Sequence, residues 1–207
     1  MKLSVEHVCE HIDRVEGTFL MGNNIKEELL ERRLRWLVAE LSDDTEEFLA
    51  AHPELKFYSV GLDCNSEYGT MLLSFNTQEE FEKTLLEYQN GEWADSYQTA
   101  EEILDLKFNT DDWEYQDVAS YQVFSSDELM AMFGDDIDSL IECMMDFNYK
   151  VLRAFVATEG FKIIPKTSDF QPICHDHEDD VLEALERTKE VLLTERSSCS
   201  VVFTTDI

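Results

Sequence analysis

Basic residues are scarce in this sequence, and their scarcity argues against several classes of function. The chain holds 16 Lys and Arg against 46 Asp and Glu, a formal net charge of −30 over 207 residues. Nucleic acids and anionic membranes are bound through cationic surfaces, so we expect this protein to bind neither of them directly. A net charge of this size opposes compaction through self-repulsion, but it favours solubility and attracts oppositely charged partners.

Glycine, proline and long apolar runs are also few. Seven Gly and three Pro argue against a long flexible linker, which would be rich in one or the other. No segment approaches the ~20 apolar residues that cross a bilayer, and the first residues lack the apolar core of a signal peptide. Five scattered cysteines form no Cys-x-x-Cys pair, which is typical of reduced thiols in a cytoplasmic protein.

The apolar residues that are present suffice for a folded core. Hydrophobic residues make up 43% of the chain and aromatic residues 11%, whereas disordered acidic chains are poor in both. The length fits one domain over residues 1–207, with a helical N-terminal part at 1–52 packed on it.

Periodicity and capping signals predict a mixture of helices and strands. Apolar residues at helical spacing, with capping pairs such as Thr77 with Glu80 and Thr99 with Glu102, predict helices at 4–15, 25–41, 44–51, 77–88, 99–106, 126–134, 136–158 and 178–193. A loop is expected at Gly17 and Gly22. Strands are predicted at 56–63, 70–75, 118–124, 161–164, 171–174 and 200–205. Because no regular βαβ alternation appears, the expected class is α+β, a mixed or antiparallel sheet of about five to six strands packed against several helices, with 136–158 as a long central helix.

The negative charge is concentrated in one third of the chain. Residues 78–146 contain 20 Asp and Glu but only two basic residues, Lys83 and Lys107, whereas the helix predicted at 25–41 is neutral. One possibility is that these acids form a solvated face while nearby aromatic side chains enter the core. The other is that the acids and the aromatic side chains together form a docking surface for a basic protein. A salt-adapted protein would be acidic throughout, so we favour the docking surface. Its predicted residues are Asp105, Asp111, Asp112, Trp113, Glu114, Tyr115, Asp117, Asp135, Asp136 and Asp138.

Two histidine patterns are candidate metal sites. His7 and His11 lie one helical turn apart with a glutamate between them, as in inverted zinc proteases. Further along, His175, His177 and Asp179 would share one side of an extended chain. Each pattern has a plainer explanation, because the first fits the exposed face of a helix and the second leads into a helix whose acidic first turn suits the helix dipole. We therefore expect no metal, no other cofactor and no catalytic residues.

Three short segments occur in a characteristic order, namely Phe57–Asp63, Ser74–Glu80 and Leu106–Tyr115, which contain an aromatic strand, an Asn-Thr-x-Glu helix start and an Asp-Trp pair. This order resembles a bacterial family of about 200 residues that is defined only as a domain of unknown function. Members of that family occur beside polymorphic toxins, so the resemblance implies an immunity protein. It assigns a function to no individual residue.

Charge and resemblance lead to the same expectation about function. We expect a cytoplasmic, non-enzymatic immunity protein whose acidic, aromatic-containing surface neutralises a cognate basic toxin domain, for example a nuclease with a cationic site made for phosphate. Two alternatives stand beside it. One is a metal-dependent hydrolase that uses a histidine cluster, and the other is an acidic nucleic-acid mimic or scaffold.

Overall fold

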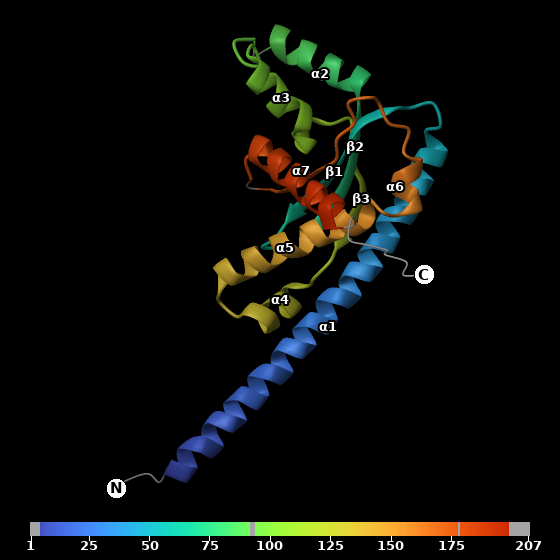
Figure 1. Cartoon of the computed structure of the whole chain (residues 1–207). Coiled ribbons are helices and arrows are strands. Elements are labelled where there is room, and N and C mark those ends of the chain that lie inside the picture. The colour runs from blue at the N-terminus through green and yellow to red at the C-terminus, as the bar shows by residue number, and fades with distance from the viewer. Residues whose placement is uncertain (1–4, 92–93, 178, 199–207) are drawn as a thin grey trace, which may run out of the picture.

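The structure, a computed structural model, describes residues 5–91, 94–177 and 179–198, and it describes side chains between residues 25 and 194 outside the same gaps. Within these residues lie seven α-helices, one 3-10 turn and a four-stranded mixed sheet (Figure 1), which confirms the predicted α+β class. None of the described helices combines the length and the apolar character needed to cross a membrane.

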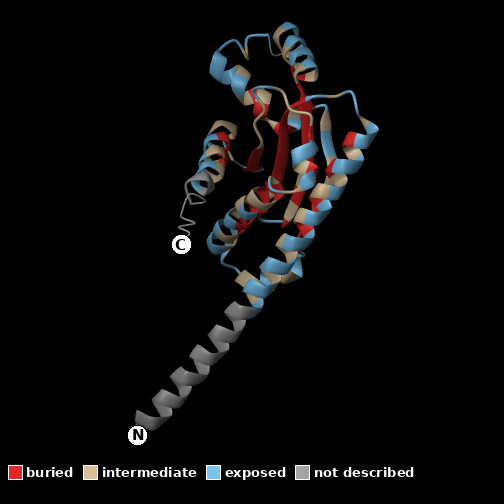
Figure 2. Cartoon of the chain, turned by 45° about the vertical axis from the view of Figure 1, so that its right-hand side comes forward, coloured by how far each residue is buried: buried red, intermediate tan, exposed pale blue. Residues whose placement is uncertain are grey.

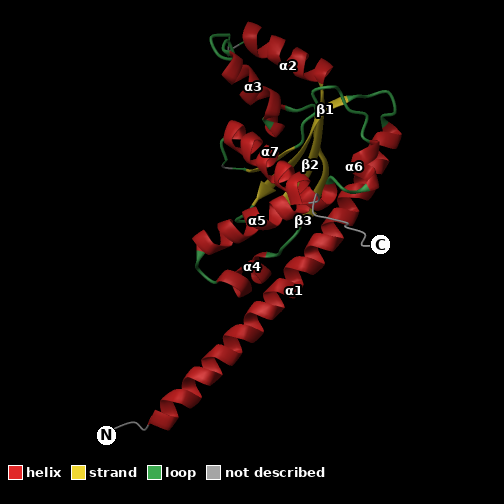
Figure 3. Cartoon of the chain, viewed as in Figure 1, coloured by secondary structure: helices red, strands yellow, loops and turns green. Residues whose placement is uncertain are grey.

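The helices lie on both sides of a small sheet, as Figure 3 shows. The helices are α1 (Val5–Ala51), α2 (Gln78–Asn90), α3 (Ala100–Phe108), α4 (Ser126–Phe133), α5 (Ile137–Phe155), α6 (Glu159–Ile163) and α7 (Val181–Ser198), with the 3-10 turn η1 at Thr110–Asp112. The strands are β1 (Phe57–Asn65), β2 (Thr70–Thr77), β3 (Tyr115–Gln122) and β4 (Ile173–Asp176). Their order is β3-β2-β1-β4, with β1 parallel to β4 and the other neighbours antiparallel.

Helix α1 replaces three predicted helices with one. The loop expected at Gly17 and Gly22 and the break expected after residue 41 are both wrong, because α1 is continuous through these positions. The reason lies in its buried stripe, in which Leu37, Leu41, Thr45 and Leu49 recur every four residues across the expected break. The Thr45 hydroxyl donates to the Leu41 carbonyl at 2.6 Å. Because this bond satisfies the buried hydroxyl, a polar residue can occupy the buried stripe of the helix.

The sheet has fewer strands than predicted. Strands expected at 56–63, 70–75, 118–124 and 171–174 correspond to β1 to β4, whereas the segment expected as a strand at 161–164 is largely helix α6. Thr158 begins α6 by accepting a hydrogen bond from the backbone N–H of Phe161. Gly160 lets α6 approach α1 closely, since an added Cβ would lie 2.4 Å from the Ser42 carbonyl oxygen. The strand predicted at 200–205 lies outside the described residues.

Most other helices begin near the predicted capping residues. Thr77 caps α2, and Thr99 forms the full capping box with Glu102 at the start of α3. The cap of α4 lies one residue earlier than predicted, because Ser125 rather than Ser126 accepts from the backbone N–H of Glu128. The helix predicted at 136–158 is α5, although α1 and not α5 is the longest helix.

The two faces of the sheet bury separate clusters, and strands β1, β2 and β4 are mostly buried whereas edge strand β3 is largely exposed (Figure 2). The first core joins α1 and α5 to one face and includes Leu41, Leu62, Phe75, Val151 and Phe155. The second core lies on the other face and consists of Tyr58, Phe81, Leu106, Phe108, Trp113, Ile173, Ala184 and Leu185, contributed by the sheet, α2, α3, α7 and the segment after η1.

One edge of the sheet is closed by a side chain. Thr188 on α7 is fully buried beside β4. Its hydroxyl accepts a hydrogen bond from the backbone N–H of Cys174 at 3.1 Å and donates to the carbonyl of the same residue at 3.3 Å. A single hydroxyl therefore satisfies two backbone groups that an edge strand would otherwise leave unpaired.

Candidate partner-binding surface

The structure divides the predicted docking residues among four places. Asp105 lies on α3, Asp111 and Asp112 lie in η1, and Glu114, Tyr115 and Asp117 lie at or just before the start of edge strand β3. Asp135, Asp136 and Asp138 lie at the connection from α4 to α5, which Figure 1 places at the opposite end of the sheet from α2 and α3. These residues therefore do not form one compact patch.

The two aromatic residues predicted as anchors pack inside the protein instead. Trp113 is 3% exposed, meets the Tyr58 ring edge to face, and donates from Nε1 to the Lys107 carbonyl at 3.0 Å. Tyr115 is half-buried against Phe48 and Phe57. Both side chains are thus committed to packing, as in the alternative that turns the aromatics into the core.

Asp112 has a structural partner. Its carboxylate accepts hydrogen bonds from the Tyr88 hydroxyl at 2.5 Å and from the Asn109 side chain at 2.7 Å. The bond to this carboxylate raises the pKa of Tyr88 to about 12, because the tyrosine proton is held between the two groups. Asp112 therefore ties α2 to η1, whereas Asp111 and Glu114 beside it are exposed.

A cleft of about 690 Å³ lies between the β1–β2 turn, α5 and the segment that joins β4 to α7. We call it the edge cleft. Its lining residues are Asn65, Glu67, Tyr68, Ile141, Met145, Asp176, His177 and Asp179. Parallel strands β1 and β4 both end here, and the carboxyl ends of parallel strands are a common place for binding crevices.

Tyr68 and Ile141 give the edge cleft an exposed apolar part. Tyr68 is 64% exposed and Ile141 is 36% exposed. Asp138 lies three residues before Ile141 and seven before Met145, so it shares their face of α5. One of the predicted docking residues therefore adjoins the edge cleft.

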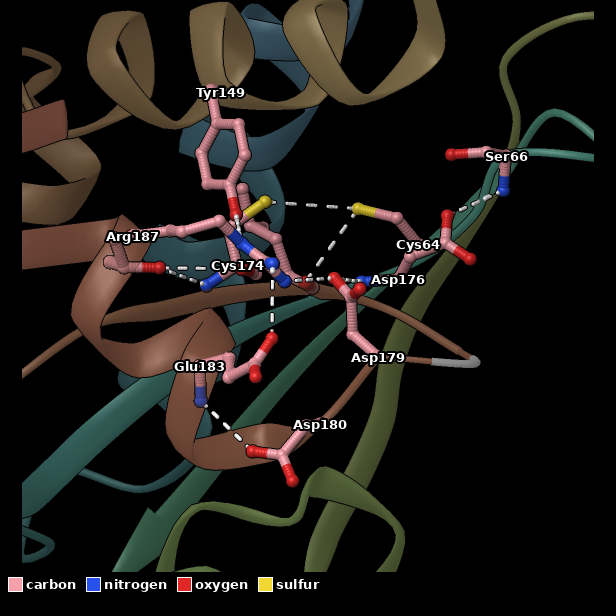
Figure 4. A network of polar contacts seen from close by, with 11 residues as sticks. Cys64, Ser66, Tyr149, Cys174, Asp176, Asp179, Asp180, Glu183 and Arg187 are labelled. Atoms are coloured by element: carbon pink, nitrogen blue, oxygen red, sulfur yellow. Dashed lines mark hydrogen bonds and ion pairs between the residues drawn. The ribbon is translucent and has the colours of Figure 1, made fainter. Parts of the chain in front are cut away.

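The acidic wall of the edge cleft is held by a network of polar contacts (Figure 4). The Asp176 carboxylate accepts from the Ser66 backbone N–H at 2.9 Å, and the Asp179 carboxylate accepts from the Asp176 backbone N–H at 3.2 Å. Arg187 on α7 pairs with Asp179 at 2.7 Å and donates from Nε to the Tyr149 hydroxyl at 3.2 Å. These contacts order the wall before any ligand arrives, which lowers the entropy lost on binding.

Asp105 on α3 lies among other acids. Burial raises the pKa of Asp105, and the carboxylates of Asp180 and Asp112 add to the effect. Asp180 directly follows Asp179 of the edge cleft, but Asp105 and Asp180 do not line the cleft themselves.

A buried polar cluster, which the sequence did not reveal, lies on the second face of the sheet. The Thr110 hydroxyl donates to the Asp63 carboxylate at 3.1 Å and lies 2.8 Å from Nε2 of His175. Because that hydroxyl has one proton, Nε2 of His175 must carry the hydrogen that completes the second bond. Burial raises the pKa of Asp63, and His175 and Thr110 partly offset the effect. The signal in the sequence was an aspartate within a mostly apolar strand.

This cluster occupies one of the histidines proposed for a metal. Asp63, Thr110 and His175 are 8%, 2% and 5% exposed, so the cluster offers little access to a substrate. His177 is exposed because β4 ends at Asp176, and Asp179 is paired with Arg187. Among the residues whose positions the structure describes, no three His, Cys, Asp or Glu side chains are placed to hold a metal ion. The side chains of His7 and His11 lie outside that part.

Comparison with known proteins identifies the chain at the level of its family. A family model described as "Domain of unknown function (DUF4303)" matches residues 37–191. The match begins at Leu37, the first fully buried residue of α1 in the described part. No curated protein and no solved structure matches the sequence. Since the matched region covers most of the 207 residues, the chain belongs to the DUF4303 family of uncharacterised domains.

Proposed function

We propose that this chain is a cytoplasmic, non-enzymatic immunity protein that neutralises a basic toxin domain by binding it through an acidic surface. The observation that carries the proposal is the large excess of carboxylates without basic neighbours. Of the acids at 78–146 that the structure describes, Glu80, Glu128 and Asp146 form ion pairs with basic side chains. Among the other described carboxylates of this segment, Asp112 and Glu102 are held by neutral donors, whereas exposed acids such as Asp111 and Glu114 are available to a cationic partner.

Charge on this scale suits the kinetic demand on an immunity protein, which must find its toxin before damage occurs. Complementary charge steers two proteins together and can raise association rates from about 10⁵–10⁶ to 10⁸–10⁹ M⁻¹s⁻¹ at low salt. Steering does not by itself give a long-lived complex, because exposed ion pairs contribute little and are screened. Slow dissociation requires desolvated anchors, for which exposed Tyr68 and Ile141 are better placed than buried Trp113.

The polar groups that could suggest an enzyme have structural explanations. The Asp63–Thr110–His175 cluster joins η1 to two strands beneath the surface, and Asp179 with Arg187 fixes the segment after β4. These roles support a binding protein rather than the alternative of a metal-dependent hydrolase.

The proposal is tested by protection of a bacterial host. A basic toxin domain encoded beside this gene would be expressed alone and together with the chain, and survival would be counted. The purified pair would then be titrated calorimetrically at low and at high salt. We expect protection, one-to-one binding and weaker binding at high salt.

Two outcomes would contradict the proposal. A host that dies equally with and without the chain would exclude neutralisation of that toxin. Binding to many unrelated basic proteins in competition with DNA would instead favour the nucleic-acid mimic, because a mimic recognises phosphate-binding surfaces in general.

A further inference from the structure

We infer that the edge cleft receives a lysine or arginine side chain of a basic protein partner, with the charged end at the acidic wall and the stem against Tyr68 and Ile141. This inference rests on the proposed function and names the place where the partner is anchored. It assigns the main contact to residues outside the set predicted from the sequence.

The charge of the lining favours a cation. Three of the eight lining residues are acidic, namely Glu67, Asp176 and Asp179, and none is Lys or Arg. Arg187 approaches from behind the wall but is already bound to Asp179 and Tyr149. A carboxylate has about four acceptor positions, so the backbone bonds that hold Asp176 and Asp179 leave capacity for a further donor.

The apolar part of the cleft favours a long side chain over a bare ion. Ile141 and Met145 line the cleft on α5, and Tyr68 lines it from the β1–β2 turn. Lysine and arginine combine an aliphatic stem, which packs on apolar surface, with a charged end that reaches polar groups. A cation placed over an exposed tyrosine ring is also attracted by the face of the ring.

The extent of the exposed apolar surface favours a protein over a small polyamine. Ile137 precedes Ile141 by one helical turn and is 56% exposed, so the apolar stripe continues along α5 from the cleft. Exposed apolar surface next to a polar rim is typical of protein interfaces. Asp138 and Glu142 are exposed on the adjoining part of α5 and supply such a rim.

The test compares two substitutions that change the net charge equally. Glu67→Lys places the change in the edge cleft, and Glu114→Lys places it at the start of β3, where the residue is also exposed. Binding of the toxin domain from the preceding experiment would be measured by calorimetry and by association and dissociation rates. We expect Glu67→Lys to weaken binding at least about tenfold, mainly through faster dissociation, and Glu114→Lys to act mainly on association.

A second pair separates apolar anchoring from charge. Tyr68→Ala removes the exposed ring in the cleft, whereas Leu86→Ala removes a side chain of similar exposure, 62%, on α2. We expect about a tenfold loss of affinity for Tyr68→Ala and no change for Leu86→Ala. Melting temperatures would verify that all four variants fold, which their exposure favours. Equal effects of Glu67→Lys and Glu114→Lys, together with no effect of Tyr68→Ala, would overturn the inference.

A probe that needs no toxin distinguishes failure of the site from failure of the function. Backbone NMR signals would be followed while a short arginine peptide, or spermine, is added to the full chain. Peptide-induced shifts at Tyr68 and Ile141 in the wild type, with the shift at Ile141 lost in Tyr68→Ala, would support the cleft even if no toxin were neutralised. Shifts spread evenly over the acidic surface, or tighter binding of spermine than of the peptide, would overturn the cleft and leave the immunity proposal standing.

Discussion

The two faces of the sheet bury different chemistry. On the first face, α1 and α5 cover aliphatic and aromatic side chains, whose burial contributes about 1.5–3 kcal/mol each without strict directional requirements. On the second face, aromatic residues adjoin a carboxylate, a hydroxyl and an imidazole that depend on one another for hydrogen bonds. The stability contributed by the first face therefore depends mainly on close packing. The stability contributed by the second face also requires that each buried polar group keeps its hydrogen-bond partner.

The largest expected effect is on the first face. Phe75→Ala should lower the free energy of unfolding by about 3–5 kcal/mol, because the ring is fully buried and lies against Phe48 and Phe57. Urea titration would measure the change, with Phe75→Leu as the control that keeps most of the volume. A loss smaller than those of the second-face variants would contradict this ranking of the two faces.

Close packing on the second face should produce the next effect. An added Cβ at Gly61 would lie 2.6 Å from Cγ2 of Thr110 and 3.0 Å from the Trp113 ring. Gly61→Ala should therefore cost about 1–3 kcal/mol in unfolding free energy through overpacking. Combining it with Thr110→Ser, which removes that methyl group and keeps the hydroxyl, should restore part of the loss. If Gly61→Ala unfolds at the same urea midpoint as wild type, η1 accommodates the added methyl group without loss of stability, and the prediction is wrong.

Removal of one hydroxyl should isolate the polar contribution of the second face. Thr110→Val keeps the side-chain shape but leaves Asp63 and His175 without their shared partner. We expect a loss of about 1–2 kcal/mol in unfolding free energy, because buried polar groups left unpaired are costly. Thr45→Val on the first face provides a comparison, since the hydroxyl it removes bonds only a helix carbonyl. Equal losses at the two sites would remove the proposed distinction between the faces.

The smallest effect should appear as a pH dependence. Because burial raises the pKa of Asp63 in the folded state, the unfolded chain ionises first as pH rises, and folded stability falls between the ordinary and the raised pKa. Asp63→Asn cannot ionise and retains an acceptor for Thr110, so its stability relative to wild type should rise across that interval and then level off. Unfolding free energies from acid to neutral pH would measure this, with exposed Asp138→Asn as control. Parallel curves for wild type and Asp63→Asn would contradict it.

Local patterns in the sequence predicted the first face better than the second. The spacing of Leu37 and Leu41 and the apolar residues of β1 and β2 are visible within short windows, because residues four apart on a helix or two apart on a strand share one face. Thr110 is 47 positions from Asp63 and 65 from His175, so their contact depends on tertiary packing. The same limit applies to Trp113, whose acidic neighbours suggested a surface position. The break expected after residue 41 was a different error, because the spacing of Leu41, Thr45 and Leu49 is itself a local helical pattern.

The candidate surface was predicted in part for a related reason. Composition located the acidic segment, and Asp138 does share the face of α5 that carries Ile141 and Met145 of the edge cleft. Tyr68 was not selected because a tyrosine in a polar turn carries no periodic signal. The cleft itself forms from three segments that are distant in sequence, so no pattern within a short stretch of the chain predicts it.

The hydroxyl of Thr188 constrains how any partner can recognise this protein. Many proteins bind peptides by letting them extend an exposed sheet edge, a mode that uses main-chain hydrogen bonds and tolerates varied sequences. At Cys174 the outward N–H and C=O of β4 are already bound to Thr188. A partner at the β4 edge must therefore be recognised through its side chains rather than its main chain. This favours selectivity for one sequence over general affinity for extended chains.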